Sequence, residues 1–390
     1  MQLIEINSSK LIKAFHSLPK LIYKDDENYI AHIRQDIEKI FDQQKNKLYK
    51  QGGKSIRWLL EDDDGKIIGR VAAFINPKTR ISSQNVRPTG GMGFFECIDD
   101  QVAANMLFKA CVDWLKEKDI EVMDGPINFG ERNEFWGLLI ENFDSPSSYQ
   151  MNYNPAYYRS LFENFGFELY FNQIIYWRDM YDDLSEKFME SYMRMNNDPD
   201  YEIRNIRGMD LDQVARDFQE VYNGAWATHA GFKELNLKVA QNIMKSLNPI
   251  IDRDIILFVF HKGRPIAFYV NIPELNDIFK YINGNLNWWG KLLFLYHKWR
   301  AERTMMVGIV FGVIKEYQGK GIDTAMIQWA RLHLVTLDKY KYTILTWIGD
   351  FNPKMMNVAK GLGGKEWRKL ATYRYNSDRS IAFERHPEIG

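Results

Sequence analysis

The sequence has few cysteines and no excess of charge of either sign. Its 390 residues include two cysteines, Cys97 and Cys111, without a third cysteine or a nearby histidine that would complete a zinc site. Both are expected to be free thiols in a reducing compartment. The 51 basic and 51 acidic side chains give a net charge of zero, whereas a surface that follows a phosphate backbone needs excess positive charge. A metal centre, a disulfide scaffold and a nucleic-acid partner are therefore disfavoured.

Long hydrophobic runs are also missing. The longest run, residues 305–314, has ten residues and includes two glycines, whereas a membrane-spanning helix needs about 20 apolar residues. The first seven residues contain Glu5 and lack the basic segment and apolar stretch of a secretory signal. We expect a cytoplasmic protein without a segment that crosses a bilayer.

Aromatic side chains are abundant instead. The chain contains 24 Phe, 21 Tyr and 11 Trp, which together make 14% of its residues. This content fits large hydrophobic cores, which we favour, and it also fits clefts walled by rings. At roughly 100–200 residues per domain, the length predicts two domains.

The two halves of the sequence repeat three landmarks at an offset of about 198 residues. The first is an apolar–polar alternation typical of an opening strand, and the second is a tight turn between apolar runs, which predicts a hairpin. The third is an Asn-Pro pair that starts a short helix ending at glycine. In this order, the landmarks lie at residues 4–6 and 201–203, at 64–72 and 262–270, and at 154–167 and 352–364. The repeat predicts two copies of one fold.

Each copy shows alternating strand and helix patterns, which predict an α/β fold with a mixed sheet rather than a helical bundle or a β-barrel. Two tandem domains are expected, at residues 1–195 and 201–390, because Asn196-Asn197-Asp198-Pro199 interrupts any periodic pattern between them. A strand, a long helix and a strand are expected at 91–98, 100–118 and 120–123 in the first copy, and at 305–314, 324–341 and 342–348 in the second.

The second copy contains a segment suited to an anion. The expected strand at 305–314 is followed by Lys315-Glu316-Tyr317-Gln318-Gly319-Lys320-Gly321-Ile322-Asp323, and a helix is expected from Thr324. Glycines let backbone N–H groups turn toward a ligand, and a helix N-terminus adds unpaired donors and partial positive charge. Neither Gly-x-Gly-x-x-Gly nor Gly-x-x-x-x-Gly-Lys-Ser/Thr is present, so hydride transfer and nucleotide hydrolysis lose support. A loop that only turns the chain is the alternative.

The stretch Gln318-Gly319-Lys320-Gly321-Ile322 resembles the acyl-coenzyme A pyrophosphate loop of the GNAT superfamily of N-acyltransferases. Asp323 departs from the small residue of that loop, and it is expected to turn away from a diphosphate or to cap the helix. The resemblance implies acyl-coenzyme A as cosubstrate, and it places Ala359 where the family has a tyrosine that protonates the leaving thiolate. It assigns cofactor binding to Gly312, Val313, Ile314, Gln318, Gly319, Lys320, Gly321, Ile322, Asp323, Thr324 and Asn352.

The first copy lacks such a loop, because residues 94–100 lead directly into a helix. We expect a degenerate GNAT-like domain there, which does not bind coenzyme A. Its distinctive stretch, residues 125–158, is rich in Asn, Tyr and Gly and predicts a long functional loop. Together with residues 346–352, this stretch resembles a bacterial family of tandem GNAT-like N-acyltransferases linked with acylation of sphingoid long-chain bases, a ceramide-synthase-like activity.

Acyl transfer to an amine needs a general base for the ammonium and an acid for the thiolate. Asp350 is the first candidate base, and a helix cap is its alternative role. Glu134 in the Asn-rich stretch is the second, which would make the site composite between the copies; its alternative is a solvated loop carboxylate. Tyr373 and Tyr375 are candidate acids, although packing in a strand would also explain them. His229 is a candidate for the acceptor site.

An insertion at residues 285–300 precedes the fourth strand of the second copy. Between Trp288 and Trp299 it combines apolar rings with Lys291 and Lys298, and Arg300 follows. This composition is typical of a helix at a membrane interface or of a lid over an acyl chain. Packing between the two copies is the alternative.

Two functions are compatible with these residues. The first is an N-acyltransferase that moves an acyl group from acyl-coenzyme A to a primary amine, either a small molecule or a lipid amine, in a cleft between the copies. The second is a non-catalytic acyl-coenzyme A or lipid sensor that keeps the fold, as Ala359 and Asp323 would allow.

Overall fold

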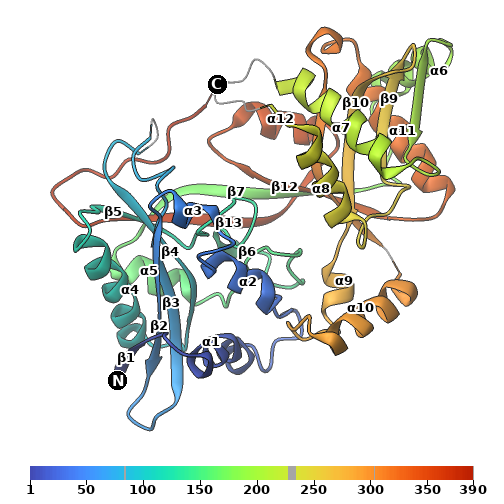
Figure 1. The fold of residues 1–390 in the computed structure, drawn as a ribbon. Helices are drawn as coiled ribbons and strands as arrows, with labels where there is room; N and C mark the ends of the chain where they lie inside the picture. Colours follow the sequence, from blue (N-terminus) through green and yellow to red (C-terminus); the bar gives the residue numbers. More distant parts are fainter. Residues whose placement is uncertain (83–84, 227–233, 303, 390) are drawn as a thin grey trace.

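The computed structural model shown in Figure 1 describes residues 1–82, 85–226, 234–302 and 304–389. The first half of the chain contains β1 (Gln2–Glu5), α1 (Ser9–Ile22), α2 (Arg34–Phe41), α3 (Lys47–Lys50), β2 (Lys54–Glu61), β3 (Ile67–Ile75), β4 (Thr89–Cys97), α4 (Gln101–Lys116), β5 (Val122–Gly125), β6 (Leu138–Glu141), α5 (Tyr158–Phe165) and β7 (Glu168–Asp179).

The helix α6 (Glu186–Asn196) connects this half to the second. The second half contains β8 (Tyr201–Asn205), α7 (Leu211–Trp226), α8 (Leu237–Leu247), β9 (Ile256–His261), β10 (Arg264–Pro273), α9 (Asn276–Phe279), α10 (Trp288–Arg300), β11 (Met305–Val313), the short helix η1 (Lys315–Tyr317), α11 (Ile322–Thr336), β12 (Tyr342–Gly349), α12 (Pro353–Gly361) and β13 (Lys365–Asn376).

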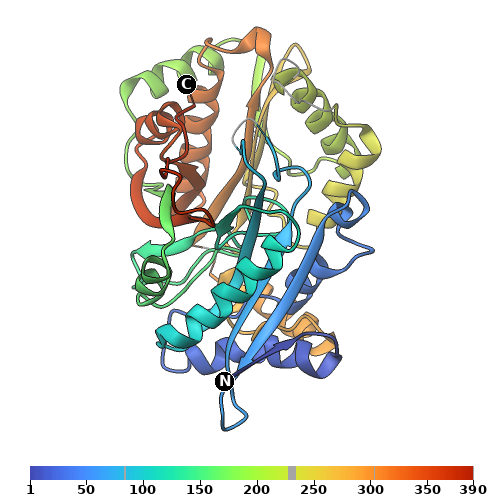
Figure 2. The same cartoon turned by 90° about the vertical axis from the view of Figure 1, so that its left-hand side faces the viewer.

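All the described strands join in one 13-stranded mixed sheet. Their order is β1-β2-β3-β4-β5-β13-β7-β12-β11-β10-β9-β8, and β6 pairs with β13 off this path. In the second half, α7 and α8 lie on one side of the strands, and α6 and α11 lie on the other (Figure 2). The predicted α/β class with a mixed sheet is confirmed.

The two halves share one pairing pattern. In the first, β1 to β4 pair as antiparallel neighbours, and β4 then pairs with β5 in parallel. In the second, β8 to β11 are antiparallel neighbours, and β11 pairs with β12 in parallel. The predicted hairpins are therefore confirmed as β2–β3 and β9–β10.

The last strand of each half pairs with the other half. β7 pairs with β12, where Trp177 faces Ile344, and β13 pairs with β5, where Tyr373 faces Gly125. β7 and β13 also pair with each other, and both cross the centre of the molecule (Figure 1). Each half therefore depends on the other to complete its part of the sheet. The division into domains at 1–195 and 201–390 stays a prediction.

Each half has its own hydrophobic core, and aromatic rings fill much of both. Phe108 lies in the core of the first half and Phe268 in the core of the second, and both are fully buried. Cys97 and Cys111 lie in the first core as free thiols, as predicted. Much of the high aromatic content therefore serves the cores.

The helix boundaries near the glycine loop differ in part from the expectation. Asn352 Oδ1 accepts a hydrogen bond from Met355 N at 3.2 Å and caps α12, with Pro353 in its first turn, as the Asn-Pro pattern predicts. The start expected at Thr324 is wrong, because α11 begins two residues earlier, with Gly321 at the N-cap. No side chain caps this helix, so Asp323 does not have the capping role that was one of its expected alternatives.

We predict that a fragment of residues 1–200 does not fold stably by itself. Without β13, the edges of β5 and β7 that flank it lose their partner, and unpaired edges favour aggregation. Coexpression with residues 201–390 is expected to restore a soluble complex with one cooperative thermal transition, measured by circular dichroism. Cooperative melting of the isolated fragment near the midpoint of the full chain would contradict this dependence.

Candidate functional site

A cavity of about 510 Å³ lies where β11 and β12 separate. The two strands pair over residues 305–308 and 342–345, and the residues that follow on both strands line the cavity. Ile327 and Ala330 of α11 form one wall, and Val358 and Ala359 of α12 form another. The lining is mainly apolar, and the volume falls within the range of small-molecule sites.

The edge of β11 that faces this cavity is unpaired beyond Gly308 in the described part of the chain. A register shift against β10 between Val270 and Asn271 makes Ile309 a bulge, and the Ile309 side chain is 46% exposed. A free strand edge presents N–H and C=O groups that an extended amide can pair with. The gap can therefore hold an extended ligand that carries amide groups.

The glycine loop adjoins the cavity through Asp323, which lies in its wall. Gly319 and Gly321 both have a φ of +75°, the left-handed conformation that favours glycine. A Cβ on Gly319 would meet no protein atom within 4 Å, so the space beside it is open. Because no side chain caps α11, the N–H groups of its first turn are available to an anion.

A further positive charge reaches the loop from α6. Arg194 Nη2 donates to Lys320 O at 2.6 Å, and it lies 2.9 Å from the position of a Cβ on Gly321. The loop motif does not contain this arginine, because it lies far away in the sequence. Open space, backbone donors and two basic side chains, Lys320 and Arg194, fit a diphosphate.

The structure brings two predicted cofactor residues, Asp323 and Asn352, into the cavity wall. The others flank it: Gly312 and Val313 on β11, Ile314 and Ile322 in the core of the second half, and Gln318, Gly319, Lys320, Gly321 and Thr324 in the loop and the first turn of α11. Gln318 Nε2 donates to Val313 O at 3.0 Å and so holds the loop against its own strand. Ala359 is buried in the wall, where the family resemblance places a tyrosine.

Asp350 lies between β12 and α12, and its carboxylate already has partners. Oδ2 accepts from Arg385 Nη2 at 2.6 Å and from Asn172 Nδ2 at 2.9 Å. The helix cap is Asn352 and not Asp350. Asp350 therefore ties the C-terminal tail to β7, and it is not among the residues that line the cavity.

Glu134 is half-buried in the loop before β6. Burial raises the pKa of its carboxyl, and the nearby Asp36 raises it further. The same loop contacts β12, because Trp347 Nε1 donates to Arg132 O at 3.1 Å, and Trp347 lines the cavity. Glu134 thus lies in a loop of the first half that contacts a lining residue of the cavity, but Glu134 is not itself among the residues that line it.

Tyr373 lies in the core of the first half and is 1% exposed. Its hydroxyl donates to Glu163 Oε1 at 2.9 Å, and it is not among the cavity residues. β13 ends the second half of the chain, but it pairs with β5 of the first half. This pairing places Tyr373 in the core of the first half. The placement does not support Tyr373 as the acid. Tyr375 packs against the same core, and His229 lies outside the described residues.

Three polar cavity residues are absent from the sequence-based predictions: Arg178, Tyr269 and Thr343. Burial raises the pKa of the Tyr269 phenol, so it is protonated at neutral pH. The alternation on β10 puts Tyr269 and Asn271 on one face, and this signal could have found them. No comparable sequence pattern predicts Arg178 as a cavity residue, because it lies on β7, a strand of the first half that pairs with β12 of the second half.

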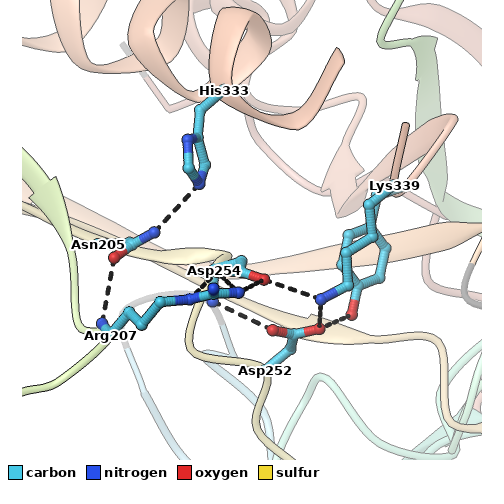
Figure 3. A network of polar contacts seen from close by, with 7 residues as sticks. Asn205, Arg207, Asp252, Asp254, His333 and Lys339 are labelled. Atoms are coloured by element: carbon cyan, nitrogen blue, oxygen red, sulfur yellow. Dashed lines mark hydrogen bonds and ion pairs between the residues drawn. The ribbon is translucent and has the colours of Figure 1, made fainter. Parts of the chain in front are cut away.

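A second polar cluster, shown in Figure 3, surrounds Asp252 and Asp254. Lys339 Nζ lies 2.6 Å from Asp252 Oδ2 and 2.9 Å from Asp254 Oδ2, and Arg207 pairs with Asp254 at 2.8 Å. Burial alone would raise the pKa of Asp252, but the hydrogen bond from Lys339 lowers it to about 2, together with bonds from Tyr340 and the Asp254 N–H. Both carboxylates are thus ionised and paired, which is typical of a structural network.

The described residues contain no helix with the length and apolar character needed to cross a membrane. They also contain no group of three or more His, Cys, Asp or Glu side chains arranged to hold a metal ion.

The chain is similar to known proteins over nearly its whole length. No protein-family model matches. The chain is 24% identical over 379 residues to a bacterial ceramide synthase of Caulobacter vibrioides, covering 96% of this chain and 97% of that protein. It is 26% identical over 383 residues to the protein YghO of Escherichia coli, covering 93% and 92%. The predicted resemblance to the ceramide-synthase-like group is confirmed.

Solved structures show the same architecture. A tandem GNAT protein from the clavulanic acid biosynthesis pathway matches with a TM-score of 0.53 and 9% identity, covering 97% of this chain and 99% of that one. A fungal multi-domain β-N-acetylglucosaminidase with a GCN5-related glucosamine N-acetyltransferase region matches with a TM-score of 0.52 and 13% identity, and the match covers 96% of this chain and 38% of the fungal one. By its topology and these likenesses, the chain is a tandem GNAT-fold protein that resembles bacterial ceramide synthase along almost its entire length.

Proposed function

We propose that the protein is an N-acyltransferase that uses acyl-coenzyme A and acts on a primary amine. The observation that carries this proposal is the continuity between the glycine loop at the start of α11 and the apolar cavity between β11 and β12. A diphosphate suits the loop, amide groups suit the free edge of β11, and an acyl chain suits the cavity. Acyl-coenzyme A contains all three groups, the diphosphate, the amide groups and the acyl chain.

Each part of the site has a defined task in this proposal. The bound cosubstrate supplies the thioester that the amine attacks. The loop residues Gly319 and Gly321, with Lys320 and Arg194 beside them, hold the diphosphate. Backbone N–H groups on the free edge of β11 orient the extended arm, and the walls of the cavity exclude water from the acyl group.

Glu134 is the base that we favour over Asp350. The Asp350 carboxylate is neutralised by Arg385, whereas Glu134 has a raised pKa and no basic partner among the ion pairs of the described residues. A carboxyl with a raised pKa is better matched than an ordinary carboxyl to take a proton from an ammonium. A base in the first half would make the site composite, as the sequence predicts.

A lipid amine is the acceptor class that we favour. The relative named as a ceramide synthase supports this class. The helix α10 supports it independently, because Trp288, Leu292, Leu295 and Trp299 form one stripe and are 62%, 48%, 61% and 85% exposed. The helix contains no acidic residue. We propose that this stripe lies on the surface of an anionic membrane.

The other interpretations of this insertion fit less well. No residue of α10 is among those that line the cavity, which disfavours a lid. Packing between the halves involves the segment before the helix, where Arg34 N donates to Gly284 O at 2.9 Å and Gln35 Nε2 donates to Asn285 Oδ1 at 3.1 Å. Within α10, Phe294 packs against the core cluster that contains Ile33 of the first half. The exposed stripe of α10 lies outside these contacts.

A sensor without turnover is the second candidate function, favoured by Ala359 at the position of the expected tyrosine. Calorimetric titration with acyl-coenzyme A, followed by a free-thiol assay with short- and long-chain amines, separates the two functions. Thiol release that depends on the amine supports the transferase. Binding without thiol release for every amine supports the sensor, and absence of binding contradicts both.

We predict that Gly319→Ala weakens coenzyme A binding at least tenfold. The new methyl would enter the open space that we assign to the diphosphate. The matched control is Gly263→Ala in the β9–β10 turn, where φ is +79° and a Cβ also meets nothing within 4 Å. Both variants carry the left-handed strain of about 1 kcal/mol, so thermal melting should shift equally. Equal calorimetric affinities would remove the loop from the site.

We predict that Glu134→Gln lowers kcat/KM at least about 100-fold. Because the base must be ionised, kcat/KM of the parent should fall as pH decreases through the raised pKa of Glu134, and the variant should lose this acidic limb. Glu131→Gln in the same loop is the control, since Glu131 is exposed. A pH–rate profile that keeps its acidic limb in Glu134→Gln would exclude Glu134 as the base.

We predict that Trp299→Ala weakens binding to vesicles about tenfold or more, because a large apolar surface leaves the interface. The vesicles contain phosphatidylcholine with phosphatidylglycerol, and binding is measured by cosedimentation. Met193→Ala on α6 is the control, since Met193 is 51% exposed and α6 lies far from α10 in Figure 1. The proposed membrane contact fails if both variants bind as the parent does.

A further inference from the structure

A second cavity, of about 330 Å³, is lined by the end of α8, the segment before β9 and the last turn of α10. Its walls differ from those of the cavity between β11 and β12, because every described residue of its lining except Ile251 is polar or charged. Its charged residues, among those that the structure describes, are Arg207, Arg253, Lys298, Lys339, Asp252 and Asp254. Four positive and two negative charges therefore meet in a space of the size of small-molecule sites.

The two carboxylates lie beneath two of the cations. The Asp252 and Asp254 side chains are 6% and 3% exposed, whereas those of Lys339 and Arg207 are 30% and 69% exposed. In Figure 3, Arg207 and Lys339 reach the carboxylates from opposite sides. Arg207 Nε and Nη2 donate to Asp254 at 2.9 and 2.8 Å, and these bonds do not use Nη1. The buried negative charges thus hold two cations in place, and the cations rather than the carboxylates face the solvent.

The other two basic side chains are held by backbone carbonyl groups. Arg253 Nη1 donates to Met209 O at 2.7 Å, and Lys298 Nζ donates to Pro249 O. A carbonyl group has no net charge, so these bonds orient the two side chains without cancelling their charges. A guanidinium has five N–H donors and an ammonium has three, and each of these bonds uses one. The described lining therefore carries two more positive than negative charges, on side chains that are already oriented.

The cavity lies beside the exposed stripe of α10. Lys298 follows Leu295 of the stripe by three residues and directly precedes Trp299, so it borders the stripe on the surface of the helix. Lys298 is half-buried, whereas Trp299 is largely exposed. With the stripe on a membrane surface, Lys298 and the cavity would lie at the level of the lipid headgroups.

The cavity is separate from the glycine loop. The loop precedes the first turn of α11, and Lys339 follows the last turn of the same helix. The 15 residues of α11 correspond to a length of about 22 Å. An anion bound in this cavity is therefore not the diphosphate that we assign to the loop.

We propose that this cavity binds a phosphate group, which comes from the headgroup of an anionic lipid or from a soluble phosphate ester. Phosphate oxygens accept hydrogen bonds, a guanidinium can donate to two of them at once, and an ammonium adds a point charge. A cation fits the cavity less well. Each oxygen of Asp252 and Asp254 already accepts a hydrogen bond, from Arg207, Tyr340 or the Asp254 N–H.

Two experimental arms distinguish the sources, and neither measures acyl transfer. In the first arm, the full-length protein is titrated calorimetrically with sn-glycerol 3-phosphate. In the second arm, cosedimentation compares vesicles of phosphatidylcholine alone with vesicles that also contain phosphatidylglycerol. Affinity for the soluble ester alone identifies a soluble ligand, and a requirement for phosphatidylglycerol identifies the headgroup. The lipid source rests on the membrane contact proposed above, whereas the soluble source does not.

We expect Arg253→Gln and Lys298→Gln each to weaken this binding at least tenfold relative to Lys291→Gln, because each removes a charge-assisted hydrogen bond to the phosphate. Lys291→Gln is the matched control, since it removes the same charge from the same helix two turns earlier, and Lys291 is not among the residues that line the cavity. A lysine that only attracts an anionic surface contributes about fivefold. All three variants should melt at the temperature of the parent.

Three results would overturn the proposal. The first is absence of affinity for sn-glycerol 3-phosphate together with vesicle binding that does not depend on phosphatidylglycerol. The second is an equal loss of binding in Lys298→Gln and Lys291→Gln, which would show a diffuse attraction instead of a site. The third is a loss of binding in Gly319→Ala but not in Lys298→Gln or Arg253→Gln, which would assign the phosphate to the glycine loop.

Discussion

The pairing of β7 with β13 is the constraint on which the rest of the molecule depends. These strands end the two halves of the chain, and each completes the sheet of the other half. The exchange joins two repeated units into one sheet, so the folding of each is coupled to the other. The exchange also places side chains of each half in the other half. Arg178 of β7 lines the cavity of the second half, and Tyr373 of β13 lies in the core of the first.

The separation of β11 from β12 creates the site. Strands in a closed ladder satisfy their backbone groups with each other, whereas strands that diverge leave donors and acceptors for a ligand. The first half separates its equivalent strands β4 and β5 as well, but it fills the space with its own chain. Ile127 N donates to Met92 O at 2.8 Å, and a Cβ on Gly93 would lie 2.0 Å from Ile127 O. The same arrangement of strands therefore leaves an open cavity between β11 and β12 in the second half, whereas the space between β4 and β5 in the first half is filled by the chain itself.

The Asn-rich stretch of the first half owes much of its composition to structure. Asn154 holds β6 by accepting from Leu139 N at 2.7 Å, Asn152 donates to Gly137 O at 2.7 Å, and Asn142 donates to Trp367 O at 2.7 Å. Amide side chains replace strand pairing here, since an irregular segment must satisfy its buried backbone groups. Among the residues that the structure describes, the Glu134 carboxylate forms no ion pair, although the charge of Lys39 acts on it, and we therefore favour Glu134 as the base.

The sequence by itself determined what depends on neighbours along the chain. The repeated hairpins, the Asn352 cap with its following proline and the left-handed glycines of the loop all follow from local backbone preferences, and each is present. Only the tertiary structure decided that Asp350 pairs with Arg385, that Arg194 reaches the loop and that Arg178 joins Tyr269 and Thr343. The physical reason is that strand alternation fixes which side chains share a face, but it does not encode which distant strand becomes the neighbour.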